Sequence, residues 1–265
     1  MLNVIPPTVV HIPHASQVVP NDVLASFEIG PDALAVELLR MTDHFTDELF
    51  SLPPEMATSI AFPVSRLVLD PERFANDDQE PMSAKGMGVV YMRTSDGLRL
   101  RPDQFPPSLR EELLMTYYYP HHTRLSVAVA AAIEKYGSCL LIDGHSFGAI
   151  PYPHEYDQNP NRPDICIGTD PIHTPPWLSD LAVLSFQELG FSVEVDRPFA
   201  GTIVPEPFFQ RNSNVLSIMV EIKRSIYMYE GSGQRLPGFS DFAATIHTAL
   251  KQLIDRASDR RAGLS

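Results

Sequence analysis

The chain has 265 residues, 44% of them hydrophobic, and a formal net charge of -13 at pH 7. This length and apolar fraction suit one large domain, which we expect to span residues 1–265. The acidic side chains are spread along the chain, so their field repels phosphate backbones and argues against nucleic acid as a partner. An anionic substrate would need local arginines to overcome this field.

The cysteines and the N-terminal segment bear on the compartment. Cys139 and Cys166 each lie in an apolar run, which predicts buried, reduced thiols of the kind found in cytosolic proteins. The N-terminal segment lacks a basic region followed by a long apolar stretch, and no apolar run approaches the roughly 20 residues of a membrane span. We therefore expect a cytoplasmic protein without a membrane partner. The sequence leaves the oligomeric state open.

Short β-rich runs alternate with longer amphipathic runs along the chain. The expected strands are residues 8–12, 58–62, 138–143, 164–168, 191–195 and 215–222. The expected helices are residues 32–51, 107–136 with a break near Pro120, 176–189 and 240–257. This alternation predicts an α/β fold with a largely parallel or mixed sheet covered on both faces. Ligands in such folds gather beyond the carboxyl ends of the strands, where we look for functional residues.

Polar side chains end three of the predicted strands. The first strand leads into His14, which is followed by small residues. Asp143 and His145 end the third strand two residues apart, so they point to the same side of an extended chain. Asp143 could orient His145 as a hydrogen-bond partner, or it could cap the following loop. Glu221 ends the last strand, where a carboxylate is costly unless it is paired or used, which favours a general base or a metal ligand.

A further acidic segment lies in the predicted helix that begins at residue 32. Asp43 and Asp47 are four residues apart and share a helix face, although acids near a helix start also stabilise the helix dipole without any other role. Two histidines, one carboxylate and a separate glutamate base form a recurring catalytic zinc site. His14, Asp43 and His145 could supply such ligands, although a strand-end histidine can equally be structural.

These segments resemble the N-formylglutamate amidohydrolase family. The likeness runs in order through PHAS at residues 13–16, TDHFTDELF at 42–50, SRLVLDPERF at 65–74, DGHS at 143–146 and VEIKRSIYM at 220–228. The family is similar to zinc exopeptidases, so the resemblance implies a zinc-exopeptidase-like three-layer αβα sandwich. It also implies one Zn²⁺ per chain, held by His14, Asp43 and His145, with Glu221 as the catalytic glutamate. His44 and Asp47 remain alternatives to Asp43.

The resemblance also indicates how a substrate would bind. Arg66 and Arg73 match family positions and would hold a substrate carboxylate, with local ion pairs in the turn that contains Asp70 as the alternative. His122 matches another family position and could donate a hydrogen bond to the oxyanion, although a histidine at a helix start is often structural.

The reaction that the resemblance implies is hydrolysis of a small anionic N-acyl amino acid. N-formyl-L-glutamate would give glutamate and formate, at the end of a histidine-degradation route. DGHS stands where the better-known formylglutamate enzymes have DAHS, which leaves the acyl group open. A broader N-acyl amino acid or peptidoglycan amidase is one alternative. A non-catalytic ligand-binding domain on the same fold is the other.

Overall fold

A computed structural model describes residues 7–263 and contains a central six-stranded sheet in the order β2-β1-β3-β6-β4-β5. The strands are β1 (Thr8–Ile12), β2 (Ala57–Ala61), β3 (Cys139–Phe147), β4 (Ile165–Gly168), β5 (Val193–Val195) and β6 (Val215–Lys223). Strands β2, β1, β3 and β6 run parallel. Strand β4 is antiparallel to β6 and parallel to β5, so the predicted mixed, largely parallel sheet is confirmed.

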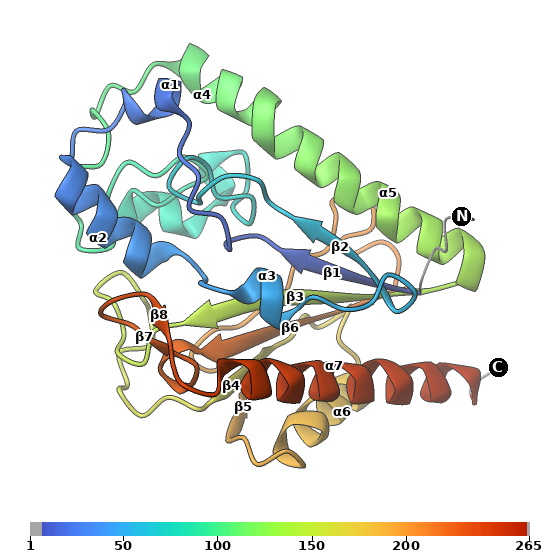
Figure 1. The fold of residues 1–265 in the computed structure, drawn as a ribbon. Coiled ribbons are helices and arrows are strands. Elements are labelled where there is room, and N and C mark those ends of the chain that lie inside the picture. The colour runs from blue at the N-terminus through green and yellow to red at the C-terminus, as the bar shows by residue number, and fades with distance from the viewer. Residues whose placement is uncertain (1–6, 264–265) are drawn as a thin grey trace.

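Helices cover both faces of the sheet, which gives the predicted α/β fold with three layers (Figure 1). Helix α5 (Tyr119–Tyr136) packs on one face, against β1, β2 and β3. Helices α6 (Pro176–Gln187) and α7 (Phe239–Ala262) pack against each other on the other face. The shorter elements are α1 (Asn21–Leu24), α2 (Pro31–Met41), α3 (Thr46–Leu49), α4 (Pro107–Leu113), the π-helical η3 (Leu114–Tyr118), the 3-10 helices η1 (Asp77–Gln79), η2 (Pro81–Lys85) and η4 (Arg224–Ile226), and the hairpin β7 (Met228–Tyr229) and β8 (Gln234–Arg235).

Alternation along β3 divides the core between the two helical layers. Leu140 and Ile142 belong to the apolar cluster that contains α6 and α7, whereas Leu141 belongs to the cluster with α5. Because side chains alternate across a strand, Asp143 and His145 share the side of Leu141. All nine residues of β3 are buried, which explains why the sequence shows one continuous apolar run.

Two expected helices differ in detail from the structure. The helix expected over 32–51 is divided, because α2 ends where Thr42 is extended (ψ 136°) and α3 begins after Phe45, which is left-handed (φ 66°). The helix expected over 107–136 has no break at Pro120. The chain stays helical from α4 through the π-helical turn η3 into α5, and Pro120 follows that turn directly, where the regular α-helical hydrogen bonds are already interrupted.

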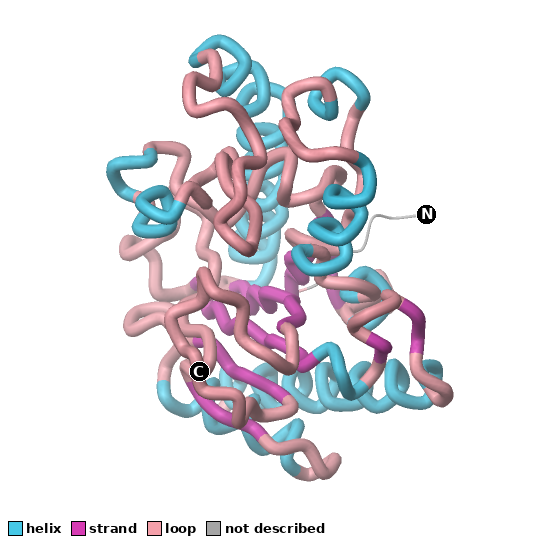
Figure 2. The backbone as a smooth tube through the Cα atoms, turned by 90° about the vertical axis from the view of Figure 1, so that its left-hand side faces the viewer, coloured by secondary structure: helices cyan, strands magenta, loops and turns pink. Residues whose placement is uncertain are grey.

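The topology brings the ends of β1, β3 and β6 to one edge of the molecule. Their arrowheads point to the left in Figure 1, and Figure 2, which shows that side from the front, has many loops gathered there.

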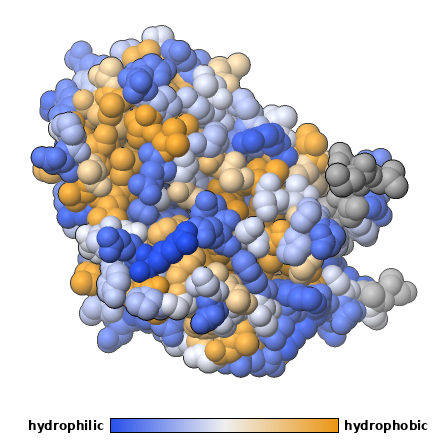
Figure 3. Space-filling view, viewed as in Figure 1, coloured by the Kyte–Doolittle hydropathy of each residue, from blue (hydrophilic) through white to orange (hydrophobic). Residues whose placement is uncertain are grey.

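In the view of Figure 3, hydrophobic side chains gather over α1 and α2, where Leu24 and Val36 are exposed. None of the helices within residues 7–263 has the length and apolar character needed to cross a membrane.

Candidate metal centre and active-site cleft

Two of the predicted metal ligands lie beside each other at the carboxyl edge of the sheet. His14 follows β1 and His145 lies in the last part of β3, and their ring centroids are 5.1 Å apart. Both side chains are buried. The adjacent, parallel pairing of β1 and β3 brings them together, and the two rings can therefore contribute to one site.

Asp43 lies on the Nδ1 side of both rings. Its Oδ2 is 3.2 Å from His145 Nδ1 and 3.6 Å from His14 Nδ1, while its Oδ1 accepts a hydrogen bond of 3.1 Å from Arg224 Nη2. Burial alone would raise the pKa of Asp43, but the two histidines and Arg224 hold it well below its ordinary value. The predicted third ligand thus lies next to both histidines, and its charge is already balanced by a buried arginine.

Glu72 lies on the opposite, Nε2 side of the same two rings. Its Oε2 is 3.1 Å from His145 Nε2 and 3.9 Å from His14 Nε2, and each of the three residues offers a ligand atom within 4.8 Å of the others. Burial would raise the pKa of Glu72, but the histidines around it hold it well below its ordinary value. The sequence analysis did not single out Glu72. Its position between Asp70 and Arg73, in a segment that carries the family resemblance, was the available signal.

Asp70 fixes the position of His14. Its Oδ1 is 2.9 Å from His14 Nε2, and its Oδ2 accepts hydrogen bonds from Arg66 (2.7 Å) and from the Tyr91 hydroxyl (2.5 Å). The pKa of Asp70, which burial would raise, is held well below its ordinary value by Arg66, His14 and Arg73. Asp70 thus holds the His14 ring through Nε2, while the buried Nδ1 of His14 has no hydrogen-bond partner in the described structure.

Asp143 contacts His145, as its spacing suggested, and holds a second histidine as well. Its Oδ1 is 3.1 Å from His145 Nε2 and 2.9 Å from His11 Nδ1, and its Oδ2 accepts from the backbone N–H of Ile203. Burial would lower the pKa of His11, but Asp143 and Glu72 raise it to about 8. His11 Nε2 in turn lies 2.8 Å from His121 Nε2, whose pKa burial lowers to about 2. Neutral His121 can therefore accept a hydrogen bond from the Nε2–H of His11.

The cluster holds more carboxyl groups than guanidinium groups. Its carboxylates are Asp43, Asp70, Glu72, Asp143 and Glu221, and its guanidinium groups are those of Arg66, Arg73 and Arg224. Carboxylates therefore outnumber guanidinium groups by two. Burial would lower the pKa of His145, but Glu72, Asp143 and Asp43 raise it well above its ordinary value, so a proton on His145 offsets part of the excess when no metal is bound. A bound divalent cation would take the place of such protons.

The ligand atoms also have suitable spacing for zinc. Tetrahedral coordination with bonds of 2.0–2.1 Å places ligand atoms about 3.4 Å apart. The distances of 3.1 and 3.9 Å from Glu72 Oε2 to the Nε2 atoms of His145 and His14 bracket that value. His145 Nε2 is buried and lacks a hydrogen-bond partner within the described part of the chain. His145 Nε2 and Glu72 Oε2 therefore fit a zinc ion as they stand, whereas His14 Nε2 would bind it only by exchanging its 2.9 Å contact with Asp70 for the metal.

Glu221 lies beside this group on the neighbouring strand. It pairs in register with His145, and its buried Oε2 has no hydrogen-bond partner within residues 7–263. Burial raises the pKa of Glu221 to about 8. An unpaired carboxyl group with an elevated pKa next to a candidate metal site has the properties of a general base that can also hold a proton.

All eight residues predicted for the site line one cleft of about 1290 Å³. They are His14, Asp43, Arg66, Arg73, His122, Asp143, His145 and Glu221. The cleft also contains Glu72, which the sequence analysis missed. Residues that are up to 207 positions apart in sequence thus share one opening, because the strand ends of the parallel sheet meet there.

The two predicted substrate-binding arginines differ in the hydrogen bonds that they make to other protein groups. Arg66 donates to Asp70 and, through Nε, to the Tyr91 hydroxyl at 3.1 Å. Arg73 Nε lies 3.8 Å from Asp70 and 3.9 Å from Glu80, and has no hydrogen-bond partner in the described structure although it is buried. Arg73 is therefore the guanidinium more available to a ligand, and Arg66 chiefly supports Asp70.

His122 is placed in the cleft wall, but its ring is engaged elsewhere. Its Nε2 donates to the carbonyl oxygen of Pro71 at 2.8 Å, and the ring packs 4.1 Å from the Tyr118 ring between centroids. Burial lowers its pKa to about 4, so the ring is neutral at pH 7. With the single proton on Nε2, the remaining Nδ1 can accept a hydrogen bond but cannot donate one to an oxyanion.

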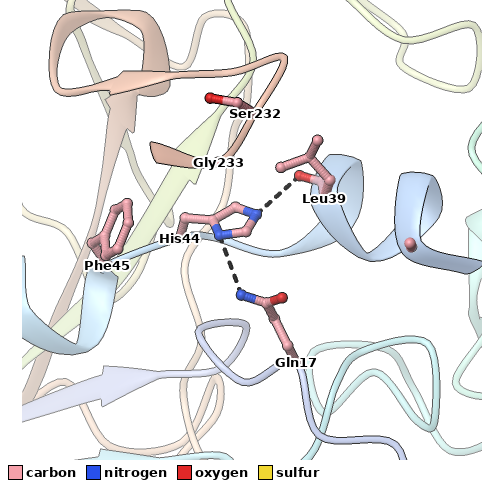
Figure 4. A pocket seen from close by; sticks show the side chains of 7 residues that line it. Gln17, Leu39, His44, Phe45, Ser232 and Gly233 are labelled. Atoms are coloured by element: carbon pink, nitrogen blue, oxygen red, sulfur yellow. Dashed lines mark hydrogen bonds between the residues drawn. The ribbon is translucent and has the colours of Figure 1, made fainter. Parts of the chain in front are cut away.

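The two alternatives to Asp43 lie away from the metal group. His44 lies in a separate pocket of about 360 Å³, where its Nε2 is 3.0 Å from the Leu39 carbonyl oxygen and its Nδ1 is 3.4 Å from Gln17 Nε2 (Figure 4). Asp47 is exposed on α3. Of the three acidic or basic candidates in this segment, Asp43 alone contacts His14 and His145.

The segment from Gly144 to Gly148 has the spacing GxSxG that is found in many serine hydrolases. That motif requires the serine on a sharp turn between a strand and a helix. Here Ser146 lies inside β3, is buried, and accepts a hydrogen bond from Arg224 Nε at 3.1 Å. Its surroundings are those of a structural residue, which leaves the histidine and carboxylate group as the chemical centre.

Comparison with known proteins agrees with this geometry. A family model described as N-formylglutamate amidohydrolase matches residues 6–228. The chain belongs to the N-formylglutamate amidohydrolase family. It is therefore an amidohydrolase, as the sequence motifs predicted. None of the curated proteins matches the chain.

Two solved structures share the fold of this family member. An N-formylglutamate amidohydrolase from Ralstonia eutropha JMP134 superposes with a TM-score of 0.80 at 22% sequence identity, over 98% of each chain. A gene product from Agrobacterium tumefaciens superposes with a TM-score of 0.65 at 19% identity, over 96% of this chain and 92% of that one. At these identities the structures show a common fold.

Proposed function

We propose that this amidohydrolase is zinc-dependent and hydrolyses the amide bond of N-formyl-L-glutamate or a closely related small anionic N-acyl amino acid. One observation carries the proposal. Two buried histidines and the Glu72 carboxylate converge beside the unpaired Glu221 carboxyl group, inside a cleft that also holds arginines. The family of the chain and the name of its Ralstonia neighbour support this choice of substrate.

His14, Glu72 and His145 would hold the zinc ion. When bound, zinc polarises a carbonyl group and lowers the pKa of water to near neutrality. Asp43 would accept a hydrogen bond from His145 Nδ1 and thereby orient that ring, with His14 Nδ1 3.6 Å away. We prefer Glu72 to the originally expected Asp43 as third ligand, because Arg224 already neutralises Asp43 while the contacts of Glu72 are with histidines.

Glu221 is the proposed base. Its carboxylate takes a proton from the attacking water and later delivers it to the leaving amide nitrogen, which becomes the amine of the free amino acid. Glu221 suits this double role because it is buried next to the metal group and has no ion-pair partner of its own among the described residues. A permanently paired carboxylate would hold the proton too weakly to return it.

The substrate carboxylate would be bound by Arg73, with Arg66 holding Asp70 in place behind it. His122 would contribute to the cleft wall, since its only proton is already donated to Pro71. The overall charge of -13 makes such local attraction necessary for an anionic substrate.

Product analysis tests the proposal. Purified protein loaded with zinc is incubated with N-formyl-L-glutamate, N-acetyl-L-glutamate and a muramoyl peptide. We expect formate and glutamate to be released in equal amounts from the first. Cleavage of the muramoyl substrate alone would favour the peptidoglycan amidase, and binding without any cleavage would favour a ligand-binding domain.

A further inference from the structure

The cleft holds more than the metal group and its arginines. We infer that the preferred substrate carries a single carboxylate and a large apolar group, as in the N-acyl derivative of an aromatic amino acid. This inference rests on the proposed hydrolytic function and names the substrate class that the cleft accepts. Four features of the cleft support it.

The first feature is its size. Sites that enclose a drug-sized ligand have volumes of roughly 300–1,000 Å³. The cleft here measures about 1290 Å³. N-formylglutamate is much smaller than a drug-sized ligand, so it would leave most of this space filled with water. A substrate that fills the cleft has a substantial further group beyond the formyl and the amino acid backbone.

The second feature is that cationic side chains lie away from one wall. The segment from residue 196 to residue 209 forms this wall, and no lysine or arginine among the described residues of that segment lines the cleft. Its lining side chains are mostly apolar, with two acids: Asp196, Pro198, Phe199, Ala200, Thr202, Ile203, Val204, Glu206, Pro207 and Phe209. A second carboxylate pointing at this wall would meet no counter-charge. An apolar group would be buried favourably.

The third feature is the limited supply of free guanidinium groups. Arg224 donates to Asp43, Ser146 and the backbone of Arg40, and Arg66 donates to Asp70 and Tyr91. Arg40 also lines the cleft, and its guanidinium is paired with Asp96. Arg73, with its unpartnered buried Nε, is the cation that remains best placed for a substrate. One available guanidinium matches one carboxylate, whereas N-formylglutamate carries two.

The fourth feature is an apolar rim. Phe74 is 50% exposed, Tyr119 42%, Val127 62% and Tyr156 73%, and all four line the cleft. Tyr119 and Val127 lie eight residues apart on α5, with Thr123 between them on the same face and also lining the cleft. Large apolar side chains gathered around one opening, from three separate segments, are typical of a ligand-binding surface.

The test compares matched substrates on the zinc-loaded enzyme. N-formyl-L-phenylalanine and N-formyl-L-tryptophan keep the scissile bond and the α-carboxylate of N-formyl-L-glutamate and replace its charged side chain with a larger apolar one. We expect kcat/KM for at least one of them to exceed that for N-formyl-L-glutamate by tenfold or more. A preference for N-formyl-L-glutamate would overturn this inference and leave the proposed function standing. Hydrolysis of none of the three would refute both.

Two exposed rim residues give variants that should fold normally. Phe74→Ala and Val127→Ala should lower kcat/KM for the apolar substrates by about threefold to tenfold each and leave the value for N-formyl-L-glutamate within twofold. Tyr229→Ala and Val36→Ala remove exposed side chains that do not line the cleft and serve as matched controls. An equal loss for all three substrates, or no loss for any, would contradict an apolar subsite at the rim.

Discussion

Glu72 and Asp43 flank the same two histidines, and substituting each in turn should separate a metal ligand from an orienting residue. The variants Glu72→Gln and Asp43→Asn keep the size of each side chain and remove its charge. We expect Glu72→Gln to lose most of the zinc affinity, because it removes an anionic ligand from the Nε2 side of the rings. Asp43→Asn should weaken zinc binding less, because it alters only the contacts on the Nδ1 side.

The magnitudes follow from the proposed ligand count. Zinc sites are worth about 10 kcal/mol or more, which shared among three protein ligands gives about 3 kcal/mol each. Loss of one ligand therefore corresponds to at least a hundredfold weaker affinity. Residues that orient metal-binding histidines typically contribute 10-fold to 100-fold. Asp43 also pairs with buried Arg224, so its variant should in addition lower the free energy of unfolding.

Competition with a chromophoric zinc chelator measures both affinities, and circular dichroism checks that each variant is folded. Asp70→Asn is a useful third variant, since Asp70 contacts His14 but also carries hydrogen bonds from Arg66 and Tyr91. The assignment of Glu72 as ligand is wrong if folded Asp43→Asn binds zinc at least tenfold more weakly than folded Glu72→Gln. In that case the ion would lie on the Nδ1 side, with Asp43 as originally expected.

Three further predictions concern Glu221 and the arginines. Glu221→Gln should keep its zinc content in elemental analysis while kcat falls by roughly 10²-fold or more, because the proton acceptor is lost; zinc loss would make Glu221 a ligand. In the metal-free protein the pKa of Glu221 is raised to about 8, so wild-type stability should fall as pH rises from about 4.5 through 8. Urea unfolding at pH 5, 7 and 9 should therefore show the free energy of unfolding of Glu221→Gln rising relative to that of wild type as pH rises, by at most about 5 kcal/mol. A difference in unfolding free energy that does not change with pH would contradict the raised pKa. Arg73→Ala should raise KM strongly with zinc content unchanged, whereas Arg66→Ala should also weaken zinc binding through Asp70, as a chelator titration would reveal.

Much of the fold follows from local patterns in the sequence. The six strands lie within a few residues of their expected positions, because each is a short β-rich run bounded by turn residues. The antiparallel direction of β4 could not be read from the sequence, since a four-residue buried run looks the same in either direction. The division between α2 and α3 comes from the extended Thr42, which ends α2, and from the left-handed Phe45, whose type does not favour that conformation.

The site was predictable where strands deliver its residues and less so where a loop does. His14, His145 and Glu221 stand at ends of strands, and all three line the cleft as expected. Glu72 lies in the loop after β2, so its approach to the histidines depends on long-range folding that local spacing does not encode. The hydrogen bond from His122 to Pro71 likewise joins segments 51 residues apart.

A zinc titration of the metal-free enzyme tests the central claim most directly. Protein stripped by a chelator and dialysed is supplied with increasing zinc, and formate release from N-formyl-L-glutamate and N-formyl-L-phenylalanine is followed at each step. The proposed function predicts no activity without metal and a linear rise that ends at one zinc per chain. Full activity of the stripped protein, or no activity toward either substrate at saturating zinc, would contradict it.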